Sequence, residues 1–369
     1  MLRRLAKEHQ VYLVSFARDS RDLDHQDELS KICEEVYLIP INGLVSKLYA
    51  GIALLTFTPL TKGFFFSTKA LKVIKDLRGR VKFDTCLAIC SSTTRYILSS
   101  DEQFRATDFV DIDSRKWLEY SKVASWPKSW IFKREHKLLE AWENKIALTE
   151  ELSAVTTSRE KEVLEENAPA ASDRIMVVPI GIDTDYFRPN PVKTIHPALV
   201  FTGQMDYLPN IDAAVFFYLN ILPRIREKRP DAEFYIVGRN PDPSLAETCK
   251  TAVVTGEVDD IRPWLCKADV FVAPMRLAFG IQNKVLEAMS CGIPVVCTSR
   301  ILQGMNVEIG TDLLAADSAE AFSKAVLSLL ESEKLAETLK ESGKSYVRSN
   351  HSLETVYDPL NKVLVQGGK

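Results

Sequence analysis

The amino-acid sequence predicts an α/β fold built from two Rossmann-like, doubly wound domains in series. Short apolar runs of strand type alternate with charged, helix-type stretches along the whole chain. Strands that alternate with helices form parallel sheets through right-handed crossovers, and the pattern occurs here twice. A length of 369 residues also fits two domains of ordinary size.

The first half of the chain carries six strand-type runs. They lie at residues 11–16, 35–41, 84–90, 107–112, 152–156 and 175–180, and the longest helix-type stretch covers 128–151. A doubly wound domain normally opens with a strand, a glycine-rich turn and then a helix. Residues 2–8 already have the character of that helix. We therefore expect the opening strand and its turn to be missing from this chain.

The second half repeats the pattern with strand-type runs at 198–202, 233–237, 253–255, 270–273, 294–297 and 313–315. Helices are expected to begin near Asn210, Ile261, Ile281 and Ser318. Residues 179–189 contain one glycine and two prolines, which punctuate the chain between the halves. We place the N-terminal domain at 1–178, the C-terminal domain at 179–352, and a final helix at 353–369 that packs back on the first domain.

Composition narrows the class of protein. The chain has 46% hydrophobic and 26% charged residues and a net charge of −3, which is typical of a soluble globular protein without a basic nucleic-acid surface. Its seven cysteines are scattered and form no C-x-x-C pair, which disfavours zinc and redox motifs. An odd set of separate cysteines fits a reducing compartment, so we expect a cytoplasmic protein.

The most apolar stretch, residues 44–66, has two interpretations. Lys47, Pro59, Lys62 and Gly63 interrupt it, so it cannot supply the ~20 apolar residues that cross a membrane. It either packs as a hydrophobic lobe on its own domain or lies on a membrane surface, with Lys47, Lys62 and Lys69 near lipid phosphates. The second interpretation places the protein peripherally on the inner face of a membrane.

Residues 280–287 are predicted to form a strand-end loop that enters a helix. They include Gly280, Ile281, Gln282, Asn283, Lys284 and Glu287. A helix N-terminus presents unpaired N–H groups and a partial positive charge, which suit a phosphate. Lys284 adds a full charge, and Glu287 can accept hydrogen bonds from two ribose hydroxyls. The alternative is an exposed lysine–glutamate pair that stabilises the helix by about 0.2–0.5 kcal/mol.

A resemblance to a known family bears on that choice. The run from Gly280 to Val296 resembles the signature helix of glycosyltransferase family 4, also called group 1. The likeness continues at residues 109–117, 179–183, 201–210 and 236–241. Together these segments resemble the bacterial exopolysaccharide branch of that family that is linked with PEP-CTERM sorting systems.

The resemblance implies a GT-B fold, in which a cleft lies between two Rossmann-like domains. It also implies a retaining transferase that uses a nucleotide-diphosphate-sugar donor and requires no metal or other cofactor. The family's common motif has two glutamates, of which the first contacts the sugar and the second holds the ribose. Glu287 matches the second, whereas Phe279 stands at the place of the first. The variant residues Gln282, Asn283 and Lys284 are then expected to supply the sugar contacts.

The same resemblance gives further segments a role in donor binding. Gly203, Gln204 and Met205 follow the run 198–202 and are expected to form a backbone cradle near the diphosphate and the acceptor. Arg239 and Arg276 each follow a strand-type run, within reach of base or phosphate. Without the resemblance, the cradle is an ordinary strand–helix turn and each arginine is a solvated surface residue.

Asp111 and Asp113 form an acidic pair at the end of the run 107–112. Such a pair holds a metal in glycosyltransferases of another fold, whose architecture this sequence does not match, so we expect no metal site. At the carboxyl end of a strand, Asp113 would orient an acceptor hydroxyl or stabilise positive charge on the sugar. The alternative is that Asp113 or Ser114 caps the following helix.

The expected function is transfer of a sugar to an acceptor hydroxyl, saccharide or lipid-linked, in the synthesis of a cell-surface polysaccharide or glycolipid. Asp113 and Lys284 are the expected catalytic residues, with Lys284 and helix N–H groups stabilising the departing diphosphate. Two alternatives stay open. One is a nucleotide-sugar 2-epimerase of the same fold, and the other is a non-catalytic protein that binds a nucleotide sugar or a partner protein.

Overall fold

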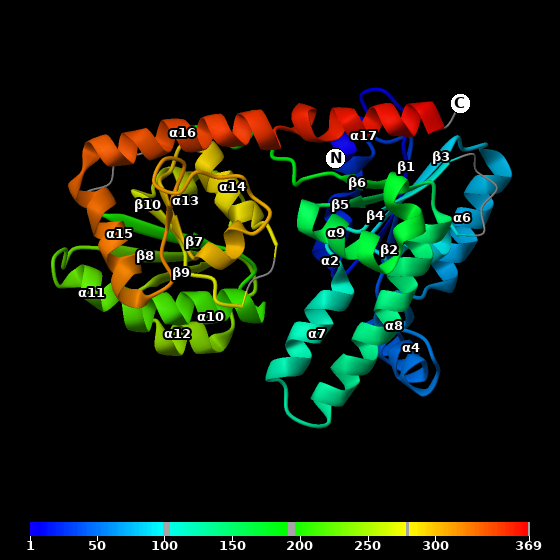
Figure 1. The fold of residues 1–369 in the computed structure, drawn as a ribbon, viewed down its shortest axis with the longest axis horizontal. Helices are drawn as coiled ribbons and strands as arrows, with labels where there is room; N and C mark the ends of the chain where they lie inside the picture. The colour runs from blue at the N-terminus through cyan, green and yellow to red at the C-terminus, as the bar shows by residue number, and fades with distance from the viewer. Residues whose placement is uncertain (99–103, 191–195, 278–279, 368–369) are drawn as a thin grey trace. The chain divides into compact units, whose positions relative to one another are not determined.

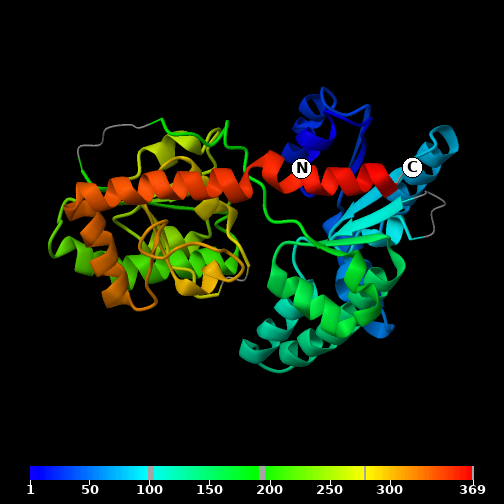
Figure 2. The ribbon, with the colours of Figure 1, turned by 45° about the horizontal axis from the view of Figure 1, so that its top comes forward.

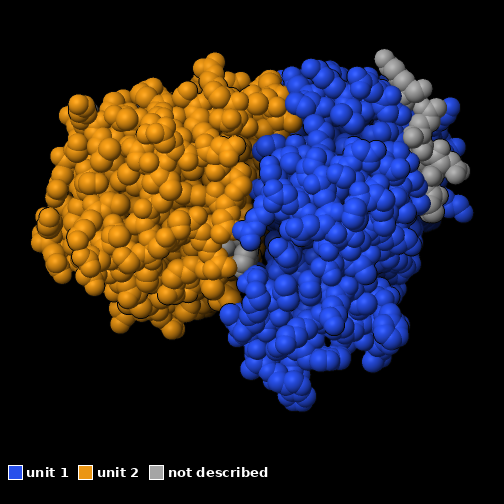
Figure 3. Space-filling model, viewed as in Figure 1, with its two compact units in different colours: residues 1–179, 357–369 blue, residues 180–356 orange. Residues whose placement is uncertain are grey.

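The computed structural model describes residues 1–98, 104–190, 196–277 and 280–367 of the chain. All strand pairings in its three sheets are parallel. The chain forms two compact units, of which unit 1 contains residues 1–179 and 357–369 and unit 2 contains residues 180–356 (Figure 3). The α/β class with parallel sheets, which the alternating sequence pattern predicts, is confirmed.

Unit 1 contains two parallel sheets rather than one. The first pairs β1 (Tyr12–Ala17) with β2 (Glu35–Pro40), and the second joins β3 (Thr85–Ile89), β4 (Phe104–Asp108), β5 (Leu152–Val155) and β6 (Ile175–Val177) in chain order. Aromatic side chains connect the two sheets. The Tyr12 ring meets the Phe83 ring edge-on with centroids 5.3 Å apart, just before β3 begins.

The helices of unit 1 lie around these sheets (Figure 1). They are α1 (Leu2–Leu5), α2 (Ser20–Asp24), α3 (Gln26–Leu29), α4 (Gly43–Leu55), α5 (Leu60–Phe64), α6 (Thr68–Arg80), α7 (Asp113–Val123), α8 (Lys128–Thr149) and α9 (Ser158–Asn167), with 3-10 turns at Thr94–Tyr96 and Pro169–Arg174. The longest, α8, buries Leu139, Trp142 and Ile146, which recur at helical spacing. They form one core cluster with Phe109 and Val155 beside the four-stranded sheet.

The last helix, α17 (Leu353–Gly367), returns to unit 1 and lies beside the start of the chain (Figure 1 and Figure 2). Its Asp358 carboxylate accepts a hydrogen bond of 2.7 Å from Arg4 Nε. Its Asn361 Oδ1 lies 2.5 Å from His9 Nε2. Polar contacts therefore fix the C-terminal helix to the first helical segment of unit 1.

Unit 2 is built on one six-stranded parallel sheet with the strand order β12-β11-β10-β7-β8-β9. Its strands are β7 (Ala198–Thr202), β8 (Glu233–Val237), β9 (Val253–Gly256), β10 (Val270–Ala273), β11 (Val295–Cys297) and β12 (Leu314–Ala315). Every residue of β7 and β10 is buried, as expected for strands covered on both faces. The strand order reverses between β7 and β10, which is where open α/β sheets bind ligands.

The helices of unit 2 are α10 (Leu208–Phe216), α11 (Leu222–Arg226), α12 (Pro243–Thr248), α13 (Arg262–Cys266), α14 (Asn283–Ser290), α15 (Ala319–Glu331) and α16 (Glu333–His351), with a π-helical turn at Phe217–Ile221 and a 3-10 turn at Ser299–Leu302. The end of α14 is fixed by Gly292, whose φ of 70° lies in the left-handed region. Its N–H donates to Met289 O at 2.9 Å and the next N–H donates to Ala288 O at 3.0 Å. Among the described residues, no helix has the length and apolar character that crossing a bilayer requires.

Candidate functional site

The candidate site of unit 2 lies at the carboxyl ends of three neighbouring strands, β8, β7 and β10. The chain leaves these strands at Gly238, Gly203 and Pro274, and α14 begins after the third of these loops. Motifs that are up to eighty residues apart in the sequence therefore share one edge of the sheet.

Gly203 and Gly238 lie in direct backbone contact. A Cβ atom at Gly238, where φ is 151°, would stand 1.7 Å from Gly203 O. A Cβ atom at Gly203 would stand 2.7 Å from Asn210 Nδ2 and 3.0 Å from Lys284 Nζ. Neither position has room for a side chain, so the two loops approach each other and Lys284 through bare backbone.

Lys284 lies in the first turn of α14, and its side chain points back to the loop after β7. Its ammonium donates a hydrogen bond of 2.5 Å to Asn210 Oδ1 and stands 4.6 Å from the centre of the Phe201 ring. Burial lowers the pKa of Lys284 to about 7, although the nearby Glu287 carboxylate opposes that shift. Burial therefore places the titration of Lys284 near neutral pH.

Glu287 lies one turn after Lys284 on the same face of α14. Its carboxylate accepts no hydrogen bond from the residues that the structure describes, and the side chain is half-buried. Burial raises the pKa of Glu287, and the Lys284 charge partly offsets that effect. Glu287 is thus a partly enclosed carboxylate with acceptor capacity left for a ligand's hydroxyl groups.

The start of α14 presents open backbone donors. The helix begins at Asn283, its N-cap is Gln282, and no side chain caps it. Gly280 has a φ of 70°, which turns the chain into the helix. Asn283 is exposed, whereas Ile281 is buried in the core of unit 2. Ile281 therefore anchors the loop, and the backbone N–H groups with Gln282 and Asn283 remain near the open end.

The loop after β7 is fixed by hydrogen bonds on both sides. Gln204 O accepts a hydrogen bond of 2.8 Å from Asn210 Nδ2. Met205 is fully buried, its N–H donates to Arg239 O at 2.9 Å, and its carbonyl accepts from Asp242 N–H at 3.0 Å. Met205 thus holds the loop in place through its backbone and the core, and its side chain does not reach the open edge.

The two arginines of this edge differ. Arg239 is exposed at the end of β8, and its guanidinium has no charged partner within the described ranges. Arg276 is engaged: it forms a bidentate pair with Asp212 of α10, with Nε–Oδ2 and Nη2–Oδ1 distances of 3.0 and 2.5 Å. Its guanidinium also stacks 4.3 Å from the Phe216 ring centre. Of the two, Arg239 has the free charge for a ligand.

In unit 1 the acidic pair follows β4, which begins and ends earlier in the chain than the predicted run 107–112. The run 107–112 was expected to be a strand, whereas β4 ends at Asp108. The Asp108 carboxylate accepts a hydrogen bond of 2.9 Å from Val110 N–H, and Val110 has a φ of 63°, which is rare for a β-branched residue. This turn ends the strand, so the predicted strand end at Ile112 is wrong.

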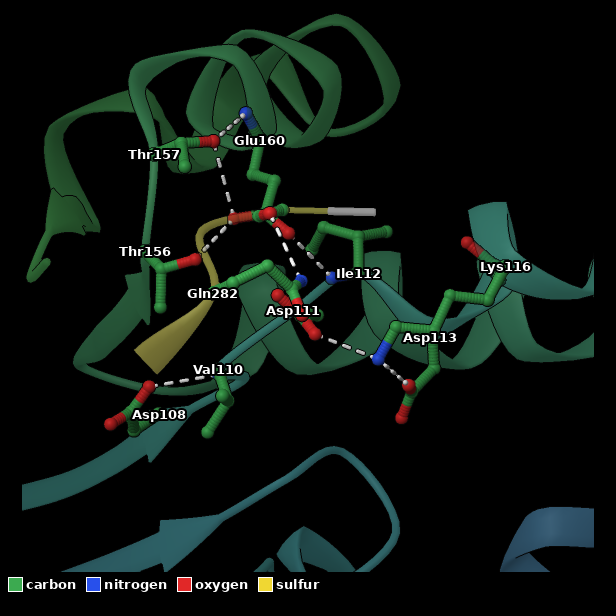
Figure 4. Close-up of polar contacts among 12 residues, drawn as sticks. Asp108, Val110, Asp111, Ile112, Asp113, Lys116, Thr156, Thr157, Glu160 and Gln282 are labelled. Carbon is green, nitrogen blue, oxygen red and sulfur yellow. Dashed lines mark hydrogen bonds and ion pairs between the residues drawn. The ribbon is translucent and has the colours of Figure 1, made fainter. Parts of the chain in front are cut away.

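Asp113 is consequently the first residue of α7 rather than the end of a strand. The capping alternative is also wrong, because the N-cap residue is Ile112, which has no polar side chain to cap the helix. Asp113 and Asp111 share one partner: Lys116 Nζ lies 2.7 Å from Asp111 Oδ2 and 3.2 Å from Asp113 Oδ1 (Figure 4). These two carboxylates raise the pKa of Lys116 despite its burial, so it stays charged.

Two glutamates, the buried Glu143 and the partly buried Glu160, hold the backbone around the acidic pair. Glu160 accepts hydrogen bonds from Ile112 N–H at 3.1 Å and from Thr156 Oγ1 at 2.8 Å (Figure 4). Glu143 accepts one of 3.1 Å from Ser114 N–H, and burial raises its pKa to about 8. The start of α7 is therefore held by side chains from α8 and α9, and the Asp111–Asp113 segment has a fixed position.

Sequence reasoning missed four residues of these two sites, namely Asn210, Lys116, Glu143 and Glu160. Asn210 belongs to the segment 201–210 that carries the family resemblance, and this was the one signal that pointed to it. Lys116 likewise belongs to the segment 109–117 of that resemblance, whereas Glu143 and Glu160 are ordinary charged residues of helices whose partners lie elsewhere in the chain. Phe279, which stands at the place of the family's first glutamate, lies outside the described residues.

Comparison with known proteins finds a family match in the C-terminal half of the chain. Residues 196–332 match the family model described as glycosyl transferases group 1. A Klebsiella pneumoniae protein, named an uncharacterized 44.6 kDa protein in the cps region, is 20% identical over 96% of this chain and 91% of its own length. A GDP-mannose-dependent α-(1-6)-phosphatidylinositol monomannoside mannosyltransferase of Mycobacterium tuberculosis is 27% identical over 51% of this chain and 54% of its own length.

Solved structures share the fold. Anabaena Alr3699/HepE in complex with UDP aligns with a TM-score of 0.68 over 99% of this chain and 94% of that one, at 12% identity. The sucrose-phosphate synthase of Thermosynechococcus elongatus aligns with a TM-score of 0.64 over 81% of this chain and 77% of that one, at 16% identity. The expected fold class, GT-B with two Rossmann-like units, is thereby confirmed.

Proposed function

We propose that this glycosyltransferase, whose group 1 domain spans residues 196–332, binds a nucleotide-diphosphate-sugar at the carboxyl edge of the unit 2 sheet. The observation that carries the proposal is the position of Lys284. Its ammonium stands beside Gly203, where no side chain can intervene, and in the first turn of an uncapped helix. A diphosphate at this edge would meet a fixed cation and backbone N–H groups together.

Each residue around Lys284 then has a role in the proposal. Glu287 accepts the ribose hydroxyls, since its carboxylate is partly enclosed and has acceptor capacity left. Gly203, Gln204 and Gly280 let backbone approach the diphosphate, and Gln282 and Asn283 contact the sugar. Arg239 contacts base or phosphate. Arg276 keeps a supporting role through Asp212 unless ligand binding releases it.

In the proposed reaction the bond between the anomeric carbon and the diphosphate oxygen breaks, and its electron pair leaves with the nucleoside diphosphate. Lys284 and the α14 N–H groups stabilise the charge that develops there. The acceptor oxygen bonds to the anomeric carbon on the same face, so configuration is retained. The acceptor proton passes to an oxygen of the leaving diphosphate. Asp113 orients the acceptor hydroxyl or stabilises positive charge on the sugar ring.

We propose that this chemistry requires no metal ion. The acidic pair Asp111 and Asp113 is the sequence feature closest to a metal site, and the Lys116 ammonium bridges both carboxylates. A divalent cation at that position would have to displace a lysine whose pKa is raised by the same two groups. In the proposal, the Lys284 ammonium neutralises the diphosphate charge in place of a metal ion.

For the biological role, we propose the synthesis of a cell-surface polysaccharide or glycolipid on the cytoplasmic side of a membrane. The K. pneumoniae relative, whose name places it in a cps region, supports the polysaccharide role. Relatives that act on phosphatidylinositol mannosides support a lipid-linked acceptor. Such an acceptor favours peripheral contact of the enzyme with the inner membrane face.

Titration calorimetry with UDP and with GDP tests the donor site. We expect one of them to bind, and Lys284→Ala to weaken it by about 10- to 100-fold, the range for losing a hydrogen-bonded charge. Lys250→Ala, an exposed lysine of the same unit, is the matched control and should bind as the parent does. If neither nucleotide binds, or if Lys284→Ala has no effect, the proposed donor site is wrong.

Product analysis then separates the remaining classes of function. Release of nucleoside diphosphate together with a glycosylated acceptor supports transfer. An epimerised nucleotide sugar that appears with no acceptor present would instead assign the chain to the 2-epimerases. Nucleotide binding without any product over all donors and acceptors tried would assign it a binding role.

A further inference from the structure

Helix α4 buries small residues and exposes large apolar ones, which is the opposite of an ordinary amphipathic surface helix. Its small residues Ser46 and Ala53 are buried against unit 1. Its large apolar residues Leu44, Leu48 and Leu55 face outward, and Leu55 is 88% exposed. Ile52 continues the same stripe, and Phe57, just beyond the helix, is 97% exposed. A stripe of exposed leucines at helical spacing needs an apolar environment outside the unit.

A second group of exposed apolar residues lies at the turn that joins α7 to α8. Val123 ends α7, Trp126 lies in the turn, and Trp130 is in the first turn of α8. Trp126 is 83% exposed and Trp130 is 57% exposed. Two exposed tryptophans are unusual on a water-facing surface, and tryptophan is enriched where an apolar phase meets water.

Hydrogen bonds place the two groups on one end of unit 1. Arg134, one turn after Trp130 on α8, donates to the carbonyl oxygens of Ala53 and Thr56. The neighbouring Glu135 accepts from Leu60 N–H at 2.6 Å and from Thr61 N–H at 2.9 Å, at the start of α5. Figure 1 shows α4 and the α7–α8 turn extending from the same end of the unit. We call their exposed residues the apolar face: Leu44, Leu48, Ile52, Leu55, Phe57, Val123, Trp126 and Trp130.

Charge is strongly segregated around this face. Residues 36–75 contain five lysines and no acidic residue, and residues 120–134 contain three lysines, one arginine and no acidic residue. The whole chain carries a net charge of −3, so acidic residues have been concentrated elsewhere. Lys47, Lys128 and Lys133 are exposed next to the apolar residues and form no ion pair with the described residues. Exposed lysines without an ion-pair partner among the described residues therefore lie around the apolar face.

The exposed apolar residues and the lysines around them together indicate what kind of partner the apolar face binds. A second copy of the chain would bring the same lysines against each other, and like charges across an interface oppose association. The centre of a protein–protein interface is also depleted in lysine. An anionic lipid surface takes the leucines and tryptophans into its acyl boundary and the lysines among its phosphates.

We propose that the apolar face docks unit 1 on a membrane surface that contains anionic lipid, with α4 and the α7–α8 turn as two separate points of insertion. The inference rests on the membrane contact proposed above and identifies its surface and its lipid class. It depends on neither Lys284 nor a bound nucleotide. A failed docking test therefore leaves the donor-site test standing, and the reverse also holds.

Flotation with vesicles tests the proposal on the full chain. We expect binding to vesicles of phosphatidylcholine and phosphatidylglycerol in equal parts, and little binding to phosphatidylcholine alone. Binding should fall as salt is raised, because exposed charges are screened. Leu48→Gln combined with Leu55→Gln should reduce partitioning by about 100-fold, since each leucine side chain loses its apolar contact. Trp126→Ser alone should reduce it by about tenfold.

The matched control combines Leu219→Gln with Ile309→Gln, two apolar residues of unit 2 that are 54% and 56% exposed. It should float as the parent does. For charge, Lys47→Glu with Lys128→Glu should reduce binding by roughly 25-fold or more, on the order of fivefold for each lysine. Lys228→Glu with Lys250→Glu makes the same change on unit 2, where both lysines are exposed. Thermal unfolding and nucleotide binding verify that every variant is folded.

Three results would overturn the proposal. One is equal or absent binding to the two kinds of vesicle. Another is a loss of binding that is the same in the control variants as in the variants of the apolar face. The third is a self-association, seen by analytical ultracentrifugation, that Leu48→Gln with Leu55→Gln abolishes while vesicle binding is absent, because the face would then be an interface between copies.

Discussion

Lys284 Nζ donates a hydrogen bond of 2.5 Å to Asn210 Oδ1, and this contact joins the helix after β10 to the helix after β7. The same Asn210 amide donates to Gln204 O at 2.8 Å, in the loop between β7 and α10. One side chain therefore positions both the cation and the backbone loop of the candidate donor site. A charge that is already in place stabilises a leaving diphosphate without reorganisation during the reaction.

The depressed pKa of Lys284 predicts that donor affinity falls as pH rises. In the proposed site the ammonium form binds the diphosphate, whereas Lys284 in the empty site loses its proton near its pKa of about 7. Above that pH the apparent Kd should increase by about tenfold per pH unit. Neither the diphosphate nor the base of a nucleotide-diphosphate-sugar titrates between about pH 6 and about pH 8, so calorimetry at these two pH values reports on the protein.

Lys284→Met serves as the control for this dependence. It should bind the donor weakly, and its affinity should not change with pH, because the titrating group is gone. Lys250→Met should keep the full pH dependence of the parent. A parent affinity that is constant over the same range would show that the Lys284 charge does not contribute to donor binding.

Asp113→Asn should slow transfer by about 10²–10³-fold if its charge acts on the reacting sugar or acceptor. The nucleotide Kd should stay within twofold of the parent, because the donor residues lie in unit 2. The readout is kcat and donor Kd measured on the same preparations. Asp173→Asn, an exposed aspartate of unit 1, is the matched control and should be fully active. An unchanged kcat in Asp113→Asn would remove Asp113 from the reaction.

Gly238→Ala should destabilise unit 2 by about 3 kcal/mol or more, since the new methyl group meets the carbonyl of Gly203 at 1.7 Å in a left-handed backbone. Gly256→Ala is the comparison: its φ is 71°, and nothing lies within 4 Å of the added Cβ. Backbone strain alone should then cost about 1–2 kcal/mol. Denaturant unfolding of both variants measures the difference, and equal losses would mean that the Gly203–Gly238 contact is not tight.

Glu143 predicts a specific pH dependence of stability. Its pKa is raised by burial from 4.5 to about 8, so the folded state binds its proton more tightly than the unfolded state does. That contribution to stability is complete below about pH 4.5 and is lost as pH rises to about 8, at about 1.4 kcal/mol per pH unit. Glu143→Gln keeps an acceptor for Ser114 N–H and removes the titration.

The free energy of unfolding of Glu143→Gln relative to the parent should therefore increase with pH across this window. Glu162→Gln, which changes an exposed glutamate of the neighbouring α9, should show a constant difference. Urea unfolding at several pH values measures both. Parallel stability curves for the parent and Glu143→Gln would mean that Glu143 is ionised in the folded protein.

Much of unit 2 was predictable because buried parallel strands leave a continuous apolar signal. The runs 198–202, 233–237 and 270–273 have the bounds of β7, β8 and β10. The run 107–112 failed because its apolar residues continue past Asp108, while the turn at Val110 is imposed by the Asp108 carboxylate and by Glu160 from α9. A positive φ at valine has no local sequence signal.

The candidate site was predictable where its residues are consecutive, as in 280–287, and unpredictable where it depends on tertiary contacts. Nothing near Asn210 indicates that it will meet a lysine seventy-four positions later. In the sequence, nothing distinguishes Glu143 from other helix residues. It gains its role because α8 packs against the first turn of α7, where Ser114 N–H donates to it. Charged side chains acquire such roles only when the fold brings a backbone N–H group to them.

Helix α7 also sets a length. It runs eleven residues from Asp113 to Val123, which at 1.5 Å per residue is about 16 Å. With Val123 and Trp126 at the lipid boundary, the length of α7 places the acidic pair at most about 16 Å above that boundary. If the two proposals hold and α7 stands along the membrane normal, a hydroxyl next to the lipid anchor lies below Asp113. The expected acceptor is then a lipid-linked saccharide whose growing end stands clear of the membrane, and a relative whose α7 is one turn shorter should use an acceptor that extends less far.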